Sequence, residues 1–342
     1  MSSIFGSFRF FFHLYYLEMR GLVLEGYYTS TIGSFPLMDT EDNRRRCLED
    51  LIALGVDYPA YPQLTDMGRQ FLDDLASQDS RIIPYQGEYR ITGREINVDV
   101  KPPGLEPFLW AINYVGRREL KVKIKAPVTG PFTLASYIII GESRGLLDRA
   151  IADIALVEQI AQIISKACGV ISKKAEMISI DEPILSIIVG FRVMFKYGEK
   201  KIVEVLNAIR ESCGSVLTGI HVCGKISPKL ANILLETNLD FLSHEFHDTP
   251  ANIKVYTPEN IKRSEKILSV GCLSSRNPAV ESVDEILGVA RKFKGYGSSL
   301  IFTPDCGFRN LIVDGSGEKG YNIAIEKLRN MVLAVAKLRE EI

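Results

Sequence analysis

The chain has 342 residues and a formal net charge of −1, with 46% hydrophobic and 24% charged residues. This balance predicts a globular protein with enough apolar material for one large domain or two ordinary ones. The lack of a basic cluster argues against nucleic acid as the main partner, and six cysteines are too few for a disulfide scaffold, so we expect a reducing, cytoplasmic compartment.

Residues 1–18 make an unusual start, with a dense aromatic run from Phe8 to Leu17. The run is too short to span a bilayer and is interrupted by Arg9 and His13. It has neither the basic start nor the cleavage site of a signal peptide. We interpret residues 1–18 as an N-terminal extension outside the fold and expect no membrane association; a functional arm is the alternative.

Beyond this start, short β-rich runs alternate with helical patterns, which is typical of parallel strands joined by helical crossovers. Eight strands are expected, at 28–32, at Tyr58 or alternatively 81–85, and at 123–127, 177–181, 216–222, 241–244, 267–271 and 300–303. Apolar residues spaced three or four apart predict a long helix over 147–175, with Cys168 on its buried stripe. Further helices are predicted at 282–291, where Ser282 would be the N-cap, and at 319–341.

Eight strand–helix units predict an α/β fold, a (β/α)8 TIM barrel over residues 19–342 with an insertion at 86–104 after the second strand. A doubly wound open sheet is the alternative, but no G-x-G-x-x-G motif follows the first strand. In a barrel the catalytic groups lie just past the C-terminal ends of the strands. The polar and thiol side chains at those positions are Ser34, Asp181, Glu182, His221, Cys223, His244, Glu245, His247, Asp248, Cys272 and Cys306.

Part of this set has the chemistry of a zinc site. His221 and Cys223 form an H-x-C pair at one strand end, and Glu245 and Cys306 follow two other strands. Zn²⁺ takes Cys sulfur, His nitrogen and carboxylate oxygen, and soft thiolates select it over magnesium or calcium. Ligands from three strand ends do not make a zinc finger. On these residues alone, a metal site and an ordinary structural role for His and Cys both remain open.

Five motifs, TSTIGSFP, TGPFTL, IDEP, HVCG and PDCGF, occur in this order. Together they resemble the catalytic domain of cobalamin-independent methionine synthase, over residues 29–308. The resemblance implies a methyltransferase that forms methionine from L-homocysteine, with Zn²⁺ held by His221, Cys223, Glu245 and Cys306. The intervals of 22 residues from Cys223 to Glu245 and 61 from Glu245 to Cys306 agree with the family pattern.

The resemblance also implies a pocket for the amino-acid part of the substrate. The family's I-G-S motif corresponds to Ile32, Gly33 and Ser34, which would hold the carboxylate, and Asp181 of IDEP would bind the ammonium. Glu88 in QGEY is the nearest match to a second acidic contact. From the residues alone, Asp181 could equally be part of a strand-end ion pair or a helix cap.

The chain departs from the family on the side of the methyl donor. Tyr137 stands where the family has a folate-stacking Trp, and Arg276 where it has a His that protonates the folate leaving group. Arginine is a poor proton donor, and a methyl-folate leaving group needs that proton, whereas a methyl–cobalt donor does not. The resemblance is therefore closer to short, single-barrel archaeal relatives, for which methylcobalamin or a methylated corrinoid protein is the implied donor. Methyl-folate is the alternative.

Three rival functions use the same pattern. Alkyl transfer to coenzyme M by a related zinc barrel has no use for Asp181, because coenzyme M lacks an ammonium group. Relatives of uroporphyrinogen decarboxylase share the barrel but need no thiolates. A zinc-binding accessory protein that captures homocysteine or a corrinoid protein without turnover stays open. For the enzyme, we expect Glu245 to be the ligand that a substrate thiolate displaces, because a carboxylate is the hardest of the four.

Overall fold

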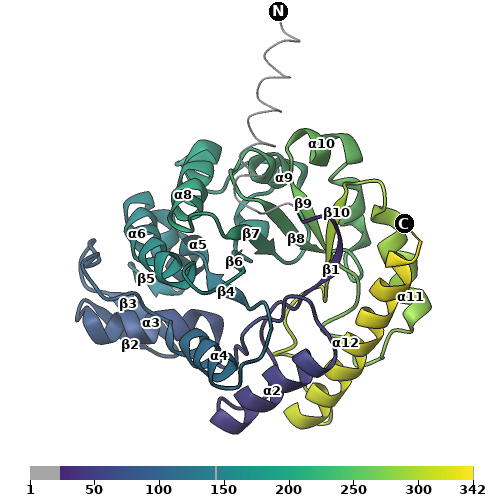
Figure 1. Cartoon of the computed structure of the whole chain (residues 1–342). Helices are drawn as coiled ribbons and strands as arrows, with labels where there is room; N and C mark the ends of the chain where they lie inside the picture. Colours follow the sequence, from purple (N-terminus) through teal and green to yellow (C-terminus); the bar gives the residue numbers. More distant parts are fainter. Residues whose placement is uncertain (1–23, 143–144, 342) are drawn as a thin grey trace, which may run out of the picture.

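The computed structural model describes residues 24–142 and 145–341, so the expected extension 1–18 lies outside the described residues. Its centre is a seven-stranded parallel sheet in the spatial order β1-β10-β9-β8-β7-β6-β4. The sheet curls, and helices surround it (Figure 1). Its strands are β1 (Gly26–Thr29), β4 (Lys125–Thr129), β6 (Met177–Asp181), β7 (Leu217–Val222), β8 (Phe241–Glu245), β9 (Ile267–Gly271) and β10 (Ser299–Thr303).

Residues 58–60 join the two edges of this sheet. Ser30 after β1 forms a parallel bridge with Tyr58, and Ala60 forms another with Lys125 at the start of β4. This segment therefore lies where an eighth strand would be. The expected α/β barrel is confirmed as a curled parallel sheet, with Tyr58 rather than 81–85 at the place of the second strand.

The other candidate for the second strand belongs to a separate, three-stranded sheet. Its strands are β2 (Ile82–Tyr85), β3 (Glu88–Ile91) and β5 (Ile138–Ile139). β2 and β3 form an antiparallel hairpin, and β3 pairs with β5 in parallel. The two-residue turn QG between β2 and β3 suits such a hairpin because glycine accepts the positive φ that the turn requires.

The helices differ from the sequence prediction mainly where they begin. They are α2 (Glu41–Ala53), α3 (Met67–Gln78), α4 (Glu106–Arg117), α5 (Pro131–Ser136), α6 (Ile154–Ile171), α7 (Leu185–Ile188), α8 (Gly198–Ser212), α9 (Pro228–Leu235), α10 (Pro258–Arg263), α11 (Val283–Ala290) and α12 (Gly317–Arg339). The predicted helix over 147–175 is wrong at its start, because the Asp153 side chain accepts a hydrogen bond from the Ala155 N–H and caps α6 there. Ser282 is confirmed as an N-cap, in a capping box with Glu285.

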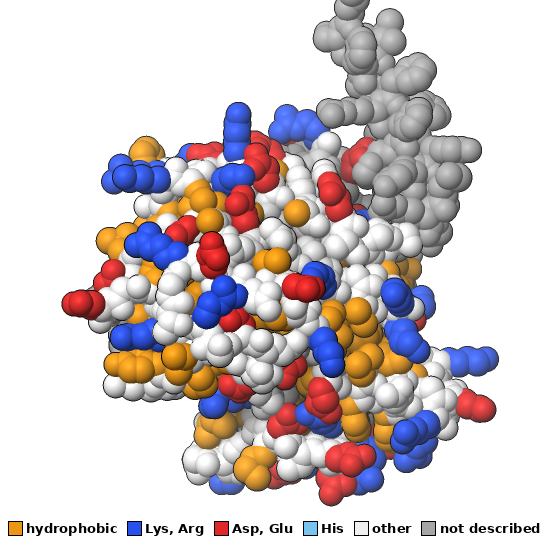
Figure 2. Space-filling model, turned by 90° about the vertical axis from the view of Figure 1, so that its left-hand side faces the viewer, with side chains coloured by type: hydrophobic (Ala, Val, Ile, Leu, Met, Phe, Trp, Pro, Cys, Tyr) orange, Lys and Arg blue, Asp and Glu red, His pale blue; other side chains and the backbone are white. Residues whose placement is uncertain are grey.

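One helix in the described part of the chain, α6, is long and apolar enough to cross a membrane by length and composition. Half of its residues are buried inside the protein, and it packs between α5 and α8. Cys168 lies on the buried face, as expected for a core residue. On the face shown in Figure 2, acidic and basic side chains are interspersed with apolar ones.

Candidate metal and substrate site

The predicted site residues come together at the C-terminal ends of the parallel strands, which we call the site edge of the sheet. Asp181, the last residue of β6, is in register with His221 on β7. Glu245, the last residue of β8, is in register with Gly271 on β9. Cys306 follows β10 by three residues. The arrangement gives this edge an imidazole, a thiol and two carboxylates from four different strands.

Three of the four predicted metal ligands lie together. The ligand atoms of His221, Cys223 and Cys306 are all within 4.8 Å of one another. His221 is buried, whereas both cysteines are partly exposed. We call these three residues the thiol–imidazole cluster.

The donor atoms of the cluster suit zinc. The Nδ1 atom of His221 lies 3.1 Å from the Ser243 hydroxyl, which fixes the ring orientation. Its Nε2 atom is buried and has no hydrogen-bond partner among the described residues. Cys306 lowers the pKa of Cys223 through a hydrogen bond, against the effect of burial. A buried, unpaired imidazole nitrogen beside two thiols is the donor set that a soft divalent metal takes.

Glu245, the fourth predicted ligand, is not among the three residues whose ligand atoms all lie within 4.8 Å of one another. Its buried carboxylate accepts a hydrogen bond from Arg276 Nη2 at 2.6 Å and another from Thr249 Oγ1 at 2.9 Å. Its backbone carbonyl accepts a hydrogen bond from the Asn252 side chain. The structure therefore gives the Glu245 carboxylate two partners of its own and leaves it outside the group of three.

The loop after β8 is held by Asp305, the neighbour of Cys306. Its carboxylate accepts hydrogen bonds from the backbone N–H groups of Phe246, His247 and Asp248 at 2.6–3.1 Å. His247, Asp248 and Asp305 also lie close enough to one another to share a cation. The backbone hydrogen bonds already occupy Asp305, so we assign this group to holding the loop.

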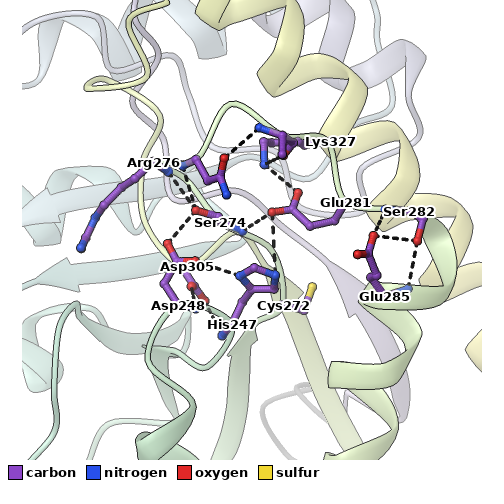
Figure 3. Close-up of polar contacts among 12 residues, drawn as sticks. His247, Asp248, Cys272, Ser274, Arg276, Glu281, Ser282, Glu285, Asp305 and Lys327 are labelled. Carbon is purple, nitrogen blue, oxygen red and sulfur yellow. Dashed lines mark hydrogen bonds and ion pairs between the residues drawn. The ribbon is translucent and has the colours of Figure 1, made fainter.

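A second set of polar contacts ties the loop after β9 to the loop after β8 (Figure 3). The Ser274 hydroxyl donates to Asp248 at 2.6 Å, and Ser274 N–H donates to Glu281 at 3.0 Å. Glu281 in turn forms a buried ion pair with Lys327 at 2.7 Å. Lys327 lies on α12, far away in sequence, so no local pattern predicts this contact.

His244 is buried beneath the site. Its Nδ1 lies 2.9 Å from the carbonyl oxygen of Val222, and its Nε2 lies 2.9 Å from the Tyr256 hydroxyl. Burial lowers the pKa of His244 to about 3, so the ring is neutral. With both nitrogens occupied, it supports the strand end.

The predicted carboxylate-binding segment follows β1. Gly33 has φ +139°, and a Cβ there would meet Pro127 at 2.9 Å, so only glycine fits. The Ser34 carbonyl accepts a hydrogen bond from the Phe308 N–H at 2.8 Å, which joins this segment to the loop that carries Cys306. Ile32 is buried and Ser34 is partly exposed.

Asp181 is buried at the C-terminal end of β6, at the site edge of the sheet. Its carboxylate accepts a hydrogen bond from the Ser179 hydroxyl at 2.8 Å. Burial raises the pKa of Asp181, although the nearby charges of His221 and Lys125 oppose the shift. Lys125, which the sequence interpretation missed, donates to the Thr31 carbonyl at 2.8 Å. A lone lysine inside an apolar strand run is the signal that could have drawn attention to it.

The comparisons with known proteins agree with this geometry. The model of the family described as "Cobalamin-independent synthase, Catalytic domain" matches residues 108–337. The chain belongs to this family. Among curated relatives in the methionine synthase family, the protein from Methanocaldococcus jannaschii is 26% identical over 91% of this chain and 99% of its own length. The protein from Pyrococcus furiosus is 25% identical over 100% of this chain and 93% of its own length. Both carry the name methionine synthase, and the chain is accordingly a methyltransferase.

Solved structures with the same fold include a methionine synthase and another methyltransferase. A B12-independent methionine synthase from Shewanella sp. W3-18-1, in complex with selenomethionine, has a TM-score of 0.65 and 17% identity, over 92% of this chain and 98% of that one. A methyltransferase from Methanosarcina mazei has a TM-score of 0.61 and 15% identity, over 94% of this chain and 97% of that one. At these identities the likeness establishes the fold alone.

Two residues expected at the methionine synthase substrate and donor sites lie on the small sheet or next to it. Glu88 on β3 pairs with Arg149 at 2.7 Å, and Tyr137 precedes β5, with its ring against Gly68. Arg276, expected on the donor side, contacts Glu245. Asn252 was missed: its side chain donates to the carbonyl groups of both Gly224 and Glu245, and nothing in the sequence around it signals this.

Proposed function

We propose that this enzyme transfers a methyl group to the thiol of L-homocysteine with Zn²⁺ bound by His221, Cys223 and Cys306 and, as the family pattern implies, by Glu245. The single observation that carries the proposal is the thiol–imidazole cluster, in which the buried His221 Nε2 has no hydrogen-bond partner among the described residues. A bound Zn²⁺ would supply the positive charge that keeps a coordinated substrate thiol as a thiolate at neutral pH. All six cysteines are free, which supports a reducing, cytoplasmic setting.

The chain's own residues would orient the amino-acid end of the substrate. The Ser34 hydroxyl and the backbone at Ile32 and Gly33 would bind the carboxylate, and Asp181 would bind the ammonium. Asp181 ends β6 and Ser34 follows β1, so the two groups come from different strands. Holding both ends of a short amino acid fixes where its thiol lies, which is the geometric part of catalysis.

In the transfer, the thiolate sulfur forms a bond to the donor methyl carbon, and the bond between that carbon and its carrier breaks. The description of the family as cobalamin-independent favours methyl-folate, whose nitrogen must gain a proton as it leaves. Arg276 favours methylcobalamin or a methylated corrinoid protein, because a guanidinium is a poor proton donor and cobalt leaves with the electron pair. We propose the corrinoid-type donor and keep methyl-folate as the second candidate.

The test measures zinc content and methionine formation together. Zinc-loaded protein is incubated with L-homocysteine and either methylcobalamin or methyl-folate, and methionine is measured by mass spectrometry. We expect one zinc per chain and methionine from methylcobalamin. The Cys306→Ser variant should lose both the zinc and the methionine formation. The Cys272→Ser variant is the control and should keep both, because the Cys272 thiol donates to the Thr303 carbonyl and is not part of the cluster.

Full zinc content in Cys306→Ser would contradict the assigned metal site. Methionine from methyl-folate alone would overturn the proposed donor but not the site. Turnover of coenzyme M in place of homocysteine would overturn the acceptor. Homocysteine binding without methionine from any donor would favour the accessory-protein alternative.

A further inference from the structure

We propose that Lys125 is a positioning residue for the amino-acid end of the substrate. Its ammonium group holds the peptide group between Thr31 and Ile32, so that the N–H of this peptide group is presented to the substrate carboxylate. The inference rests on the proposed function and adds a residue to it. It concerns how the acceptor thiol is bound, and neither the metal nor the methyl donor.

The first observation is a buried lysine with little to balance its charge. Lys125 begins β4 and is 1% exposed. Its Nζ donates to the Thr31 carbonyl at 2.8 Å and, among the residues that the structure describes, has no other hydrogen-bond acceptor and no ion-pair partner. An ammonium group has three donors, and burying a charge is costly unless it is paired. An apolar side chain would therefore serve the packing of the sheet better, and the lysine calls for another role.

The second observation concerns the backbone that follows Thr31. None of the N–H groups of Ile32, Gly33 and Ser34 donates a hydrogen bond to any residue in 24–142 or 145–341. Ile32 and Gly33 are buried, and buried N–H groups normally have a partner. Consecutive N–H groups without partners can bind an anion, and the carboxylate of an amino acid is such an anion.

The peptide group between Thr31 and Ile32 joins the two observations. In a trans peptide the C=O and the N–H lie in one plane and point in opposite directions. A cation on the Thr31 carbonyl therefore polarises the Ile32 N–H as a donor, since hydrogen bonds in a chain strengthen one another. Both partners are fixed at their own positions. The Thr31 hydroxyl accepts a hydrogen bond from the Ala60 N–H at 3.0 Å, and the Lys125 N–H donates to the Pro59 carbonyl at 2.9 Å.

The rest of the pocket matches this arrangement. A Cβ on Gly33 would lie 2.9 Å from the Pro127 ring, and Pro127 and Lys125 share one face of β4 because they are two residues apart. The segment after Thr31 thus packs on the face that carries the lysine. Asp181 and Lys125 also act on each other electrostatically. Together they offer one negative and one positive charge to a substrate that carries both.

The experiment compares Lys125→Met and Lys125→Gln with the wild-type cobalt(II)-substituted protein. The first change removes the charge and the donor, whereas the second keeps a donor for the Thr31 carbonyl. Affinity is measured from thiolate-to-metal absorption, which needs no turnover. The thiols are L-homocysteine, 4-mercaptobutanoate, which lacks the ammonium, and 3-amino-1-propanethiol, which lacks the carboxylate. Lys266→Met is the matched control, because Lys266 also donates to backbone carbonyls, but just before β9, opposite the site.

We expect Lys125→Met to weaken the binding of both thiols that carry a carboxylate by about tenfold or more, the usual effect of losing a charged hydrogen-bonding group. The binding of 3-amino-1-propanethiol should not weaken. Lys125→Gln should lose less than Lys125→Met, and Lys266→Met should lose nothing. In the zinc enzyme, KM for L-homocysteine should rise in Lys125→Met while kcat is kept, because Lys125 touches no reacting atom.

Unchanged affinities for the two carboxylate-bearing thiols in the Lys125 variants would overturn this inference and leave the proposed function intact. An equal loss for all three thiols would also overturn it, because Lys125 would then act on the fold or the metal. If Lys125→Met does not fold, the affinities of Lys125→Gln decide alone. A wild-type protein without thiolate absorption in the presence of L-homocysteine would overturn the proposed function and, with it, this role of Lys125.

Discussion

Two adjacent buried carboxylates at the end of β6 have different partners. Glu182 accepts three hydrogen bonds, from the N–H groups of Phe132 and Thr133 and from the Thr133 hydroxyl. Asp181 accepts a hydrogen bond from the Ser179 hydroxyl. A carboxylate has room for about four donors, so Asp181 retains the capacity to bind an ammonium group, whereas Glu182 serves to cap α5.

We expect Asp181→Asn to raise KM for L-homocysteine by about 10- to 100-fold, because a hydrogen bond to a charged group contributes about 1.5–3 kcal/mol. The matched substrate is 4-mercaptobutanoate, which has the thiol and the carboxylate but no ammonium. Its KM should be the same in the wild-type and variant enzymes. Steady-state kinetics that show equal losses for both thiols would mean that Asp181 acts on the metal or the fold.

The site could be predicted from the sequence to the extent that strand order alone assembles it. His221, Cys223 and Cys306 each follow a recognisable apolar run, so their meeting at one edge depends only on the strands being parallel. The direction of the Glu245 side chain could not be predicted. The Glu245 carboxylate accepts a hydrogen bond from Arg276, which lies 31 residues further along the chain and extends from a loop without regular structure.

At the scale of elements, the start of α5 shows that the motifs TGPFTL and IDEP also have a structural role. Gly130, which precedes α5, has no side chain, and the Glu182 carboxylate lies in the space that a Cβ would fill. The carboxylate can therefore reach the free N–H groups of the first turn of α5. The T-G-P and D-E-P motifs are thus partners in one buried contact.

Gly130→Ala should lower the free energy of unfolding by about 1–3 kcal/mol, the usual effect of overpacking a closely packed interior. Gly116→Ala is the control, because Gly116 lies in α4 with no atom within 4 Å of an added Cβ. It should be neutral or stabilise by up to about 1 kcal/mol. Urea denaturation of both variants measures the difference, and equal midpoints would contradict the packing argument.

Over the whole sheet, seven strands were predictable because each is a short apolar run, and their observed bounds agree with the predicted ones to within three residues. The eighth strand position could not be assigned in the same way, because residues 58–60 form isolated bridges to β1 and β4 and no continuous strand. Pro59 and Pro62 flank Ala60 and lack the N–H that a strand ladder needs. These prolines leave no apolar run long enough to mark the segment as a strand. The sequence therefore also offered the apolar run at 81–85 as the second strand.

The N-terminal ends of the strands, opposite the site, carry a partly buried charge that serves the fold. Lys266, just before β9, donates to the carbonyl groups of Thr237 and Leu239, both at 2.6 Å. Burial lowers the pKa of Lys266 from 10.5 to about 8. The strands thus present chemistry at one end and structural contacts at the other, as in other barrels of this type.

Lys266 makes the stability of the protein depend on pH. Between pH 8 and 10.5 the unfolded chain binds more protons at this residue than the folded one, so stability rises with pH. Relative to Lys266→Met, the wild-type protein should gain at most about 1.4 kcal/mol per pH unit across this window. Denaturation at several pH values measures the difference, with the exposed Lys262→Met as control. A pH-independent difference between wild-type and Lys266→Met would be the contrary result.

The pairing of the first strand with the last, Gly26 opposite Ser299, also sets the order in which the site is completed during translation. A ribosome adds roughly 5–20 residues per second from the N-terminus, so the segment around Ser34 emerges first and Cys306 last. Until β10 has left the ribosome, only His221 and Cys223 of the thiol–imidazole cluster have been made, and the first strand of the sheet has no partner in β10. The same strand that closes the sheet brings the third donor, so we expect the nascent chain to capture zinc tightly only once its synthesis is nearly finished.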